Sequence, residues 1–172
     1  FSTNVFRQAF AYYKKILEIG YPRNDVLFSK NNEQDIMRLK KELGLPLDKK
    51  IILYAPTWRD DEFYAQGKYK FTSKIDFNLM REALQDEYVF IVKYHYLVQD
   101  QIDWKAYEGF IYNYDMTYDI SLLYLVSDIL ITDYSSVIFD YSLLKRPIAF
   151  IANDLEEYLK ERDFYYPYLD FI

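Results

Sequence analysis

Residues 127–150 have the sequence SDILITDYSSVIFDYSLLKRPIAF. The short apolar run Asp128–Thr132 does not alternate with polar residues, which predicts a strand that is buried on both faces. Small hydroxyl residues follow this strand, and the helical pattern of Ser136–Leu144 then leads to a second apolar run, Pro147–Ala152. This order of strand, helix and strand is typical of a parallel sheet whose faces are covered by helices.

The same alternation extends toward the start of the chain. Earlier apolar runs predict strands at Lys50–Ala55, Tyr88–Lys93 and Gly109–Tyr112. Apolar spacing predicts helices at Val5–Ile19, Glu33–Leu43, Asp76–Gln85, Ser121–Val126 and Leu155–Glu161, with loops at Gly20–Asp25 and Arg59–Lys74. Asn32 is the expected N-cap of the second helix, and Gly44 is its expected C-terminal stop. We therefore predict an α/β fold with a doubly wound, mainly parallel Rossmann-like sheet, in which ligands bind beyond the carboxyl ends of the strands.

The composition indicates one globular domain and excludes several functions. The chain has 172 residues, 51% of them hydrophobic and 28% charged, and residues 1–45 are expected to form a helical lead-in to the sheet. Its net charge of −6 argues against binding along a nucleic-acid backbone, which requires a basic face. With no cysteine and one histidine, the chain cannot form disulfides or a Cys/His zinc site. Its four glycines form neither a GxGxxG loop nor a Walker-type loop, which argues against NAD binding and P-loop ATPase activity.

The sequence shows neither a membrane span nor a signal peptide. No apolar run reaches the roughly 18 residues that a membrane span needs, and the first residues lack the pattern of a signal peptide. The sequence starts at Phe1 without a methionine, so we expect it to be part of a longer protein.

The turn after the fourth predicted strand is the first candidate site. Ser135 and Ser136 precede a helix, where hydroxyl side chains can cap the helix while backbone N–H groups face outward and favour an anion. A plain helix cap is the alternative. Asp140 lies four residues after Ser136 on the same helical face, so it could accept hydrogen bonds from a ribose or remain a solvated carboxylate.

Two further groups follow the first and second strands. The segment YAPTWRD at residues 54–60 places Arg59 at the edge where ligands bind, and its guanidinium suits phosphate; the alternative is an ion pair with a neighbouring aspartate. His95 could donate to a phosphate oxygen or carry a proton, or it could simply be a packed or surface residue. The acidic residues 60–62 could hold a metal ion, but a solvated turn is the preferred interpretation. Because all these groups follow strand ends, we expect them to converge on one site.

The chain resembles the CDP-glycerol glycerophosphotransferase family, the polymerases and primases of bacterial wall teichoic acid. The resemblance rests on GYPRND at residues 20–25, YAPTWRD at 54–60, KYH at 93–95, the stretch at 127–150 quoted above and RDFYY at 162–166. It implies that the chain is the C-terminal, nucleotide-binding half of a two-domain GT-B type transferase, with the N-terminal acceptor domain outside this sequence.

The resemblance also implies a reaction and a site. Members transfer glycerol phosphate, or in relatives ribitol phosphate, from a CDP-activated donor to a lipid-linked teichoic acid acceptor, with release of CMP. The implied location is cytoplasmic, at the inner face of the cell membrane, and no cofactor or metal ion is implied. Arg59 and His95 would contact the donor phosphates, and His95 would also take part in catalysis. The full set of implied donor-binding residues is Thr57, Arg59, His95, Asp133, Ser135, Ser136 and Asp140, with Asp140 placed by analogy with GT-B glycosyltransferases.

The sequence departs from the family pattern in three places. Tyr96 follows His95 where the family usually has proline, and Asp163 follows Arg162 where glycine is frequent. The HGT-type histidine motif of the N-terminal domain is absent, so this chain alone is expected to bind a nucleotide without turnover. Two alternatives remain open: a GT-B glycosyltransferase that uses a UDP- or GDP-sugar, and a non-catalytic nucleotide-binding module.

Overall fold

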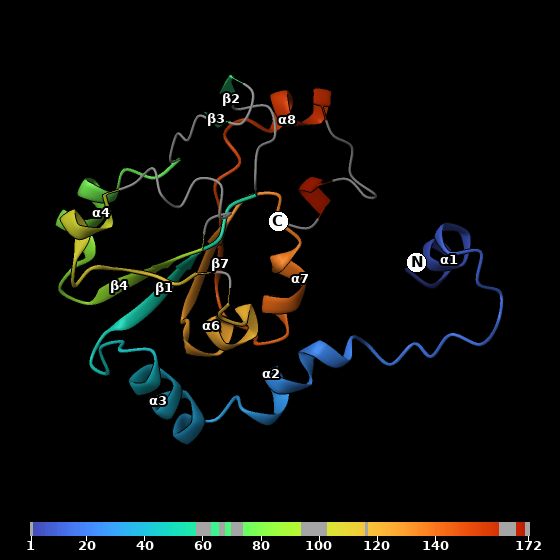
Figure 1. Cartoon of the computed structure of the whole chain (residues 1–172), viewed down its shortest axis with the longest axis horizontal. Helices are drawn as coiled ribbons and strands as arrows, with labels where there is room; N and C mark the ends of the chain where they lie inside the picture. Colours follow the sequence, from blue (N-terminus) through green and yellow to red (C-terminus); the bar gives the residue numbers. More distant parts are fainter. Residues whose placement is uncertain are drawn as a thin grey trace.

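A five-stranded parallel sheet forms the centre of the structure, a computed structural model that describes residues 2–57, 63–65, 68–69, 74–93, 103–115, 117–161 and 168–170 (Figure 1). The strands of this sheet are β1 (Lys50–Tyr54), β4 (Tyr88–Val92), β5 (Ile111–Asn113), β6 (Ile129–Thr132) and β7 (Ile148–Phe150). All five strands predicted from apolar runs are confirmed, as is the α/β fold with a doubly wound parallel sheet.

The strands lie in the order β5-β4-β1-β6-β7, so the order in which the chain adds them reverses at β1. From β1 the chain adds β4 and then β5 on one side, and it returns to add β6 and then β7 on the other side. β1 and β6 pair in parallel, with Leu53 opposite Leu130 and Tyr54 opposite Ile131. In such sheets the reversal opens a crevice between the two central strands at their carboxyl ends.

Alternate residues of the strands point to opposite faces of the sheet, and each face packs into its own hydrophobic core. Ile51 and Leu53 face one core, in which the sheet packs against α2 (Asp25–Ser29), α3 (Glu33–Glu42), α6 (Ile120–Val126) and α7 (Val137–Ser142). Ile52 and Tyr54 face the other core, with α4 (Phe77–Leu84) and the 3-10 helix η2 (Trp104–Tyr107). Strands buried on both faces in this way explain why the apolar runs do not alternate with polar residues.

The predicted N-cap and C-terminal stop of the second helix are confirmed, and so is the predicted third helix. Asn32 caps α3 by accepting a hydrogen bond from the Asp35 N–H at 3.0 Å, and Gly44 follows the helix with φ of +68°. A positive φ is favourable for glycine, because it lacks the Cβ atom that would collide with the backbone. Asp76 caps α4, and α8 (Leu155–Glu161) has the predicted bounds. Among the described residues, no helix has the length and apolar character that crossing a membrane requires.

The prediction of one helix over Val5–Ile19 is wrong. Helix α1 (Ser2–Ala9) ends early, and the segment after it runs without regular structure to the 3-10 helix η1 (Pro22–Asn24), away from the sheet in Figure 1. The apolar side chains that suggested the longer helix are exposed: 71% for Phe10, 76% for Tyr13 and 59% for Leu17. A short helix in water depends on packing of its apolar face, and here that face has little to pack against within the described structure.

Two predicted loops contain regular structure. The segment Gly20–Asp25 includes η1, which runs directly into α2. The segment Arg59–Lys74 includes an antiparallel hairpin of β2 (Phe63–Ala65) and β3 (Lys68–Tyr69). Strands of two or three residues are too short to show an alternating pattern in the sequence.

Candidate functional site

The carboxyl ends of β1 and β6 are fastened to each other at the point where the strand order reverses. The buried Thr132 hydroxyl donates to the carbonyl of Ala55 at 2.7 Å, and the Ala55 N–H donates to the carbonyl of Ile131 at 3.0 Å. The two loops that leave these strands therefore begin at fixed positions relative to each other. They are the loops in which the sequence analysis placed Thr57 and Asp133.

Asp133 and Thr57 meet directly. The Asp133 side chain accepts a hydrogen bond from the backbone N–H of Thr57, at 2.7 Å, and another from the N–H of Tyr134, at 2.6 Å. Both bonds end on the same carboxylate oxygen, Oδ1, and Asp133 is only 4% exposed. A buried carboxylate requires such partners, because losing its hydration without replacement costs several kcal/mol. The site thus contains a carboxylate that connects two strand-end loops through their backbone.

The Thr57 hydroxyl is an exception to this pairing. Its Oγ1 atom is buried and has no hydrogen-bond partner within the described structure. An unpaired buried polar group costs about 1–3 kcal/mol, so each one needs an explanation. A ligand oxygen beside Thr57 would supply the missing partner.

Ser135 and Ser136 lie at the start of α7, as predicted, and the hydroxyl that accepts a hydrogen bond from the first turn of this helix belongs to Ser135 and not to Ser136. Ser136 occupies the N-cap position with φ −64° and ψ −7°, and its side chain makes no capping hydrogen bond. A capping side chain needs a more extended backbone at this position than the helical one seen here. The Ser135 Oγ lies 3.5 Å from the Val137 N–H, at the outer limit of a hydrogen bond. Ser136 is exposed, and its hydroxyl makes no hydrogen bond that caps the start of the helix.

Asp140 is not a solvated carboxylate. It accepts a hydrogen bond from the Asn24 side chain at 2.7 Å and forms an ion pair with Arg23 at 3.1 Å. Its side chain is 15% exposed. These contacts join η1, which lies within the GYPRND motif, to α7, which lies within the stretch 127–150. A ribose hydroxyl at Asp140 would share the carboxylate with Asn24 and Arg23.

Lys93 also lies at this edge of the sheet, although no role was predicted for it from the sequence. It follows β4, and its ammonium donates to the backbone carbonyls of Tyr114 and Asp115 beyond the end of β5. Burial lowers the pKa of Lys93, and the negative charge of Asp115 opposes this lowering. Lysine at the end of an apolar strand, two positions before His95, was the available sequence signal. Lys93 fastens the ends of β4 and β5 as Asp133 fastens those of β1 and β6.

The loop after β6 is also supported by aromatic residues near the end of the chain. The Tyr134 ring stacks on Tyr158 with centroids 4.1 Å apart, and it meets Tyr168 edge to face at 5.1 Å. The Tyr134 hydroxyl donates to Asp154 at 2.9 Å, and Lys74 forms an ion pair with the same carboxylate at 3.3 Å. The site loop is therefore held from α8 and from the segment that follows the β2-β3 hairpin.

Arg59 and His95 lie outside the described residues, as do the acidic residues 60–62. The predicted contacts of Arg59 and His95 with phosphate therefore stay predictions. In the ranges that are described, no group of three or more His, Asp or Glu side chains could hold a metal ion.

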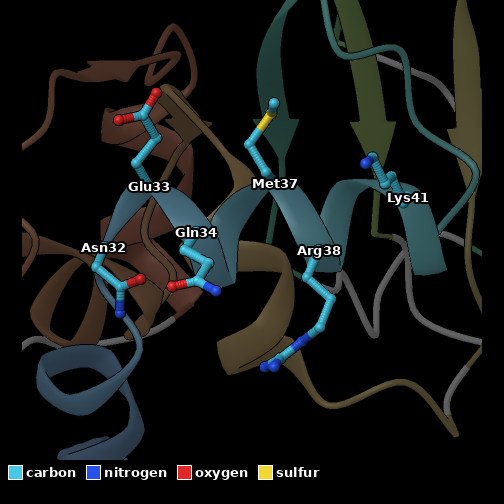
Figure 2. Close-up of a pocket in the computed structure, with 6 residues that line it drawn as sticks. All are labelled: Asn32, Glu33, Gln34, Met37, Arg38 and Lys41. Atoms are coloured by element: carbon cyan, nitrogen blue, oxygen red, sulfur yellow. The ribbon is translucent and has the colours of Figure 1, made fainter.

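A surface groove elsewhere lies along α3 (Figure 2). It is lined by Asn32, Glu33, Gln34, Met37, Arg38 and Lys41. Arg38 points away from Glu33 and Met37 in Figure 2, and it pairs within the helix with Asp35 at 2.5 Å and Glu42 at 3.5 Å. The six lining residues include none of the candidate donor-site residues predicted from the sequence, so the groove and the strand-end site are separate features.

Comparisons with known proteins bear on the function of the strand-end site. The family model described as CDP-Glycerol:Poly(glycerophosphate) glycerophosphotransferase matches residues 1–172. A teichoic acid poly(glycerol phosphate) polymerase of Bacillus subtilis (strain 168) is 50% identical over 98% of this chain and 23% of that protein. A teichoic acid glycerol-phosphate transferase of Staphylococcus aureus (strain NCTC 8325 / PS 47) is 48% identical over 98% of this chain and 43% of that protein.

A solved structure shows the same fold. The wall teichoic acid polymerase TagF matches with a TM-score of 0.88 and 49% identity, over 98% of this chain and 42% of that one. A TagF variant soaked with CDPG matches with the same TM-score and 47% identity, over 99% of this chain and 42% of that one. The chain spans less than half the length of these relatives. It belongs to the CDP-glycerol:poly(glycerophosphate) glycerophosphotransferase family.

Proposed function

We propose that this chain is the donor-binding domain of an enzyme that transfers glycerol phosphate from CDP-glycerol to a teichoic acid acceptor and releases CMP. The observation that carries the proposal is the hydrogen bond between the Thr57 N–H and Asp133, which joins the YAPTWRD and TDYSS motifs where the strand order reverses. Glycerol is favoured over ribitol because the glycerol-phosphate relatives are 48–50% identical. A teichoic acid poly(ribitol-phosphate) polymerase of Bacillus spizizenii (strain ATCC 23059 / NRRL B-14472 / W23) is 38% identical.

The proposed reaction is an in-line phosphoryl transfer. An acceptor hydroxyl attacks the β-phosphorus of CDP-glycerol and loses its proton, while the bond from the β-phosphorus to the oxygen of the departing CMP breaks. Such a reaction needs chiefly positioning and stabilisation of the negative charge on the phosphoryl oxygens. Arg59 and His95 contact the donor phosphates, and His95 also takes part in catalysis. The backbone N–H groups of Ser135 and Ser136 and the Thr57 hydroxyl complete the donor site, and Asp140 is placed near the ribose.

The rest of the enzyme supplies the acceptor side of the reaction. The proposal gives the full-length protein a GT-B arrangement, with an N-terminal domain that carries an HGT-type histidine motif and binds a lipid-linked acceptor. The solved relatives are long enough for a second domain, because this chain covers 42% of TagF. The enzyme then works at the inner face of the cell membrane as a peripheral protein.

Calorimetric titration of the full-length protein with CDP-glycerol tests this proposal, with CMP, CDP and a UDP-sugar as comparisons. We expect binding that is selective for the cytidine nucleotides, and release of CMP when an acceptor is added. Preference for the UDP-sugar would favour a glycosyltransferase. Nucleotide binding by the intact protein without any transfer would favour a non-catalytic module.

Arg59→Ala and His95→Ala are each expected to lower the turnover of the full-length enzyme at least hundredfold. Loss of one preorganised donor to a developing charge typically costs about 2.7–4 kcal/mol in the transition state. Steady-state kinetics measures the effect, and Arg38→Ala is the matched control. Its side chain is 55% exposed on α3, so turnover should stay within about twofold of the wild-type rate. Rates near wild type in Arg59→Ala or His95→Ala would remove that residue from the site.

A further inference from the structure

One oxygen of Asp133 connects two loops that are far apart in the sequence. Asp133 Oδ1 accepts from the N–H of Tyr134 in its own loop and from the N–H of Thr57, 76 residues earlier, in the loop after β1. The distances, 2.6 and 2.7 Å, lie at the short end of the range for N–H···O hydrogen bonds. This oxygen is therefore engaged with the protein backbone.

Asp133 is itself held from a third direction. The Tyr168 hydroxyl donates to the Asp133 backbone carbonyl at 2.9 Å, and Tyr168 is 5% exposed. Immediately before Asp133, the Thr132 hydroxyl donates to the carbonyl of Ala55. With the backbone on both sides of the carboxylate fixed, Asp133 has little freedom to turn toward a ligand without breaking its bond to Thr57.

We propose that Asp133 is a positioning residue that sets the loop after β1 against the loop after β6. Through its bond to the Thr57 N–H, it orients the unpaired Thr57 hydroxyl. The Ser135 and Ser136 amides belong to the other loop, so one carboxylate aligns both sides of the donor site. This inference rests on the proposed function for the identity of the donor, but the bond itself does not depend on it.

Another aspartate provides a matched control. Asp128 lies just before β6, and its Oδ2 accepts a hydrogen bond from the Ile51 N–H of β1 at 2.8 Å. Asp128 and Asp133 thus make the same kind of bond between the same two strands, one at the amino ends and one at the carboxyl ends. Loss of either bond is expected to lower stability, whereas only loss of Asp133 is expected to disturb the donor site.

The test compares Asp133→Ala, Asp133→Asn and Asp128→Ala in the full-length enzyme. Asp133→Ala should raise the KM for CDP-glycerol at least tenfold and lower kcat/KM at least hundredfold, because small misplacements of reacting groups have effects of that size. The KM for the acceptor should not change. Asp133→Asn keeps a carbonyl oxygen that can accept both N–H bonds, so it should retain at least about a tenth of the wild-type kcat/KM. Asp128→Ala should leave the KM for CDP-glycerol unchanged.

Each outcome decides the proposal. A structural role alone would reduce the fraction of active enzyme, which lowers kcat and leaves the KM for CDP-glycerol at its wild-type value; that result in Asp133→Ala would overturn the proposal. Equal losses of kcat/KM in Asp133→Asn and Asp133→Ala would also overturn the proposal. The negative charge of Asp133, and not its hydrogen-bond-accepting oxygen, would then be essential. If Asp133→Ala does not fold, Asp133→Asn alone tests the proposal: a kcat/KM below about a tenth of the wild-type value would overturn it.

Hydrogen exchange separates this proposal from the proposed function. Without any ligand, the Thr57 and Tyr134 amides should be protected in the wild type and in Asp133→Asn, and should exchange at least tenfold faster in Asp133→Ala. Unchanged exchange in Asp133→Ala would overturn the positioning role even if CDP-glycerol is the donor. Failure of the wild type to bind CDP-glycerol would overturn the proposed function and leave the exchange result to decide the role of Asp133.

Discussion

A substitution at Thr57 should affect ligand binding and protein stability in different ways. Its Oγ1 atom has no hydrogen-bond partner in the part of the chain that is described. Thr57→Val keeps the shape and removes the unpaired hydroxyl, so we predict that the free energy of unfolding is unchanged or rises by about 1 kcal/mol. Binding of CDP-glycerol should weaken about tenfold, because one hydrogen bond of roughly 1.4 kcal/mol is lost. Urea unfolding and calorimetry of the full-length protein measure the two effects.

Thr57→Ser is the matched control, since it keeps the hydroxyl and removes a methyl group. Its affinity for CDP-glycerol should stay within about threefold of the wild-type value. If Thr57→Val binds the donor as tightly as the wild type does, the hydroxyl does not contact CDP-glycerol.

The kinds of residue at the site could be predicted from the sequence, but their partners could not. The family resemblance assigned Thr57 and Asp133 to one site, and the two residues meet at one edge of the sheet. The partner of the Asp133 carboxylate is a backbone N–H 76 residues away, which no side-chain pattern encodes. Asp140 gives a similar result: its helical position was predicted, while Asn24 contacts it from 116 residues away.

At the scale of elements, the contact of η1 with α7 combines one buried and one exposed hydrogen-bond donor. Asn24 is 8% exposed, whereas the Arg23 side chain is 65% exposed. Asn24→Ala should therefore lower the free energy of unfolding by about 1–3 kcal/mol, because it removes a buried partner of the Asp140 carboxylate. Arg23→Ala should cost at most about 1 kcal/mol, since water replaces an exposed ion pair well. Chemical denaturation checks this order, and the reverse order would assign the stability of the contact to the ion pair.

The elements that could be predicted are those whose pattern reflects burial in this domain. The runs around Leu53 and Ile91 are continuous because both strands are covered on two faces, and both residues are fully buried. Phe10 and Leu17 show equally regular spacing, yet the chain there is not helical and both are exposed. Spacing reports an apolar face but not the surface that covers it, which explains the wrong prediction for residues 5–19.

At the scale of the whole molecule, the topology offers a way for an acidic chain to bind the anionic donor that we propose. The chain has a net charge of −6, which does not favour a phosphate compound over long distances. The reversal of strand order at β1 collects Thr57, Ser135 and Ser136 at one sheet edge. Binding there would depend on short-range hydrogen bonds and local cations, so it should be less sensitive to salt than binding to a basic surface.

Tyrosine burial makes the stability of the whole molecule sensitive to alkaline pH. Burial raises the pKa of Tyr114, Tyr124 and Tyr141 above the usual value of 10.0. These groups stay protonated in the folded state while the unfolded chain loses its protons near pH 10. Their stabilising contribution is therefore complete below pH 10 and is lost as the pH rises beyond it. Each of the three groups can contribute a slope of about 1.4 kcal/mol per pH unit in that range.

A spectrophotometric titration followed together with circular dichroism checks this prediction. Tyr114, Tyr124 and Tyr141 should ionise only as the secondary structure is lost, because burial raises the pKa of each. Tyr141→Phe removes one buried group, together with its 3.1 Å hydrogen bond to the Ser127 carbonyl. It should lower stability at neutral pH and make the alkaline loss less steep. Ionisation of every tyrosine in one step, with the circular dichroism unchanged, would contradict the effect of burial on these pKa values.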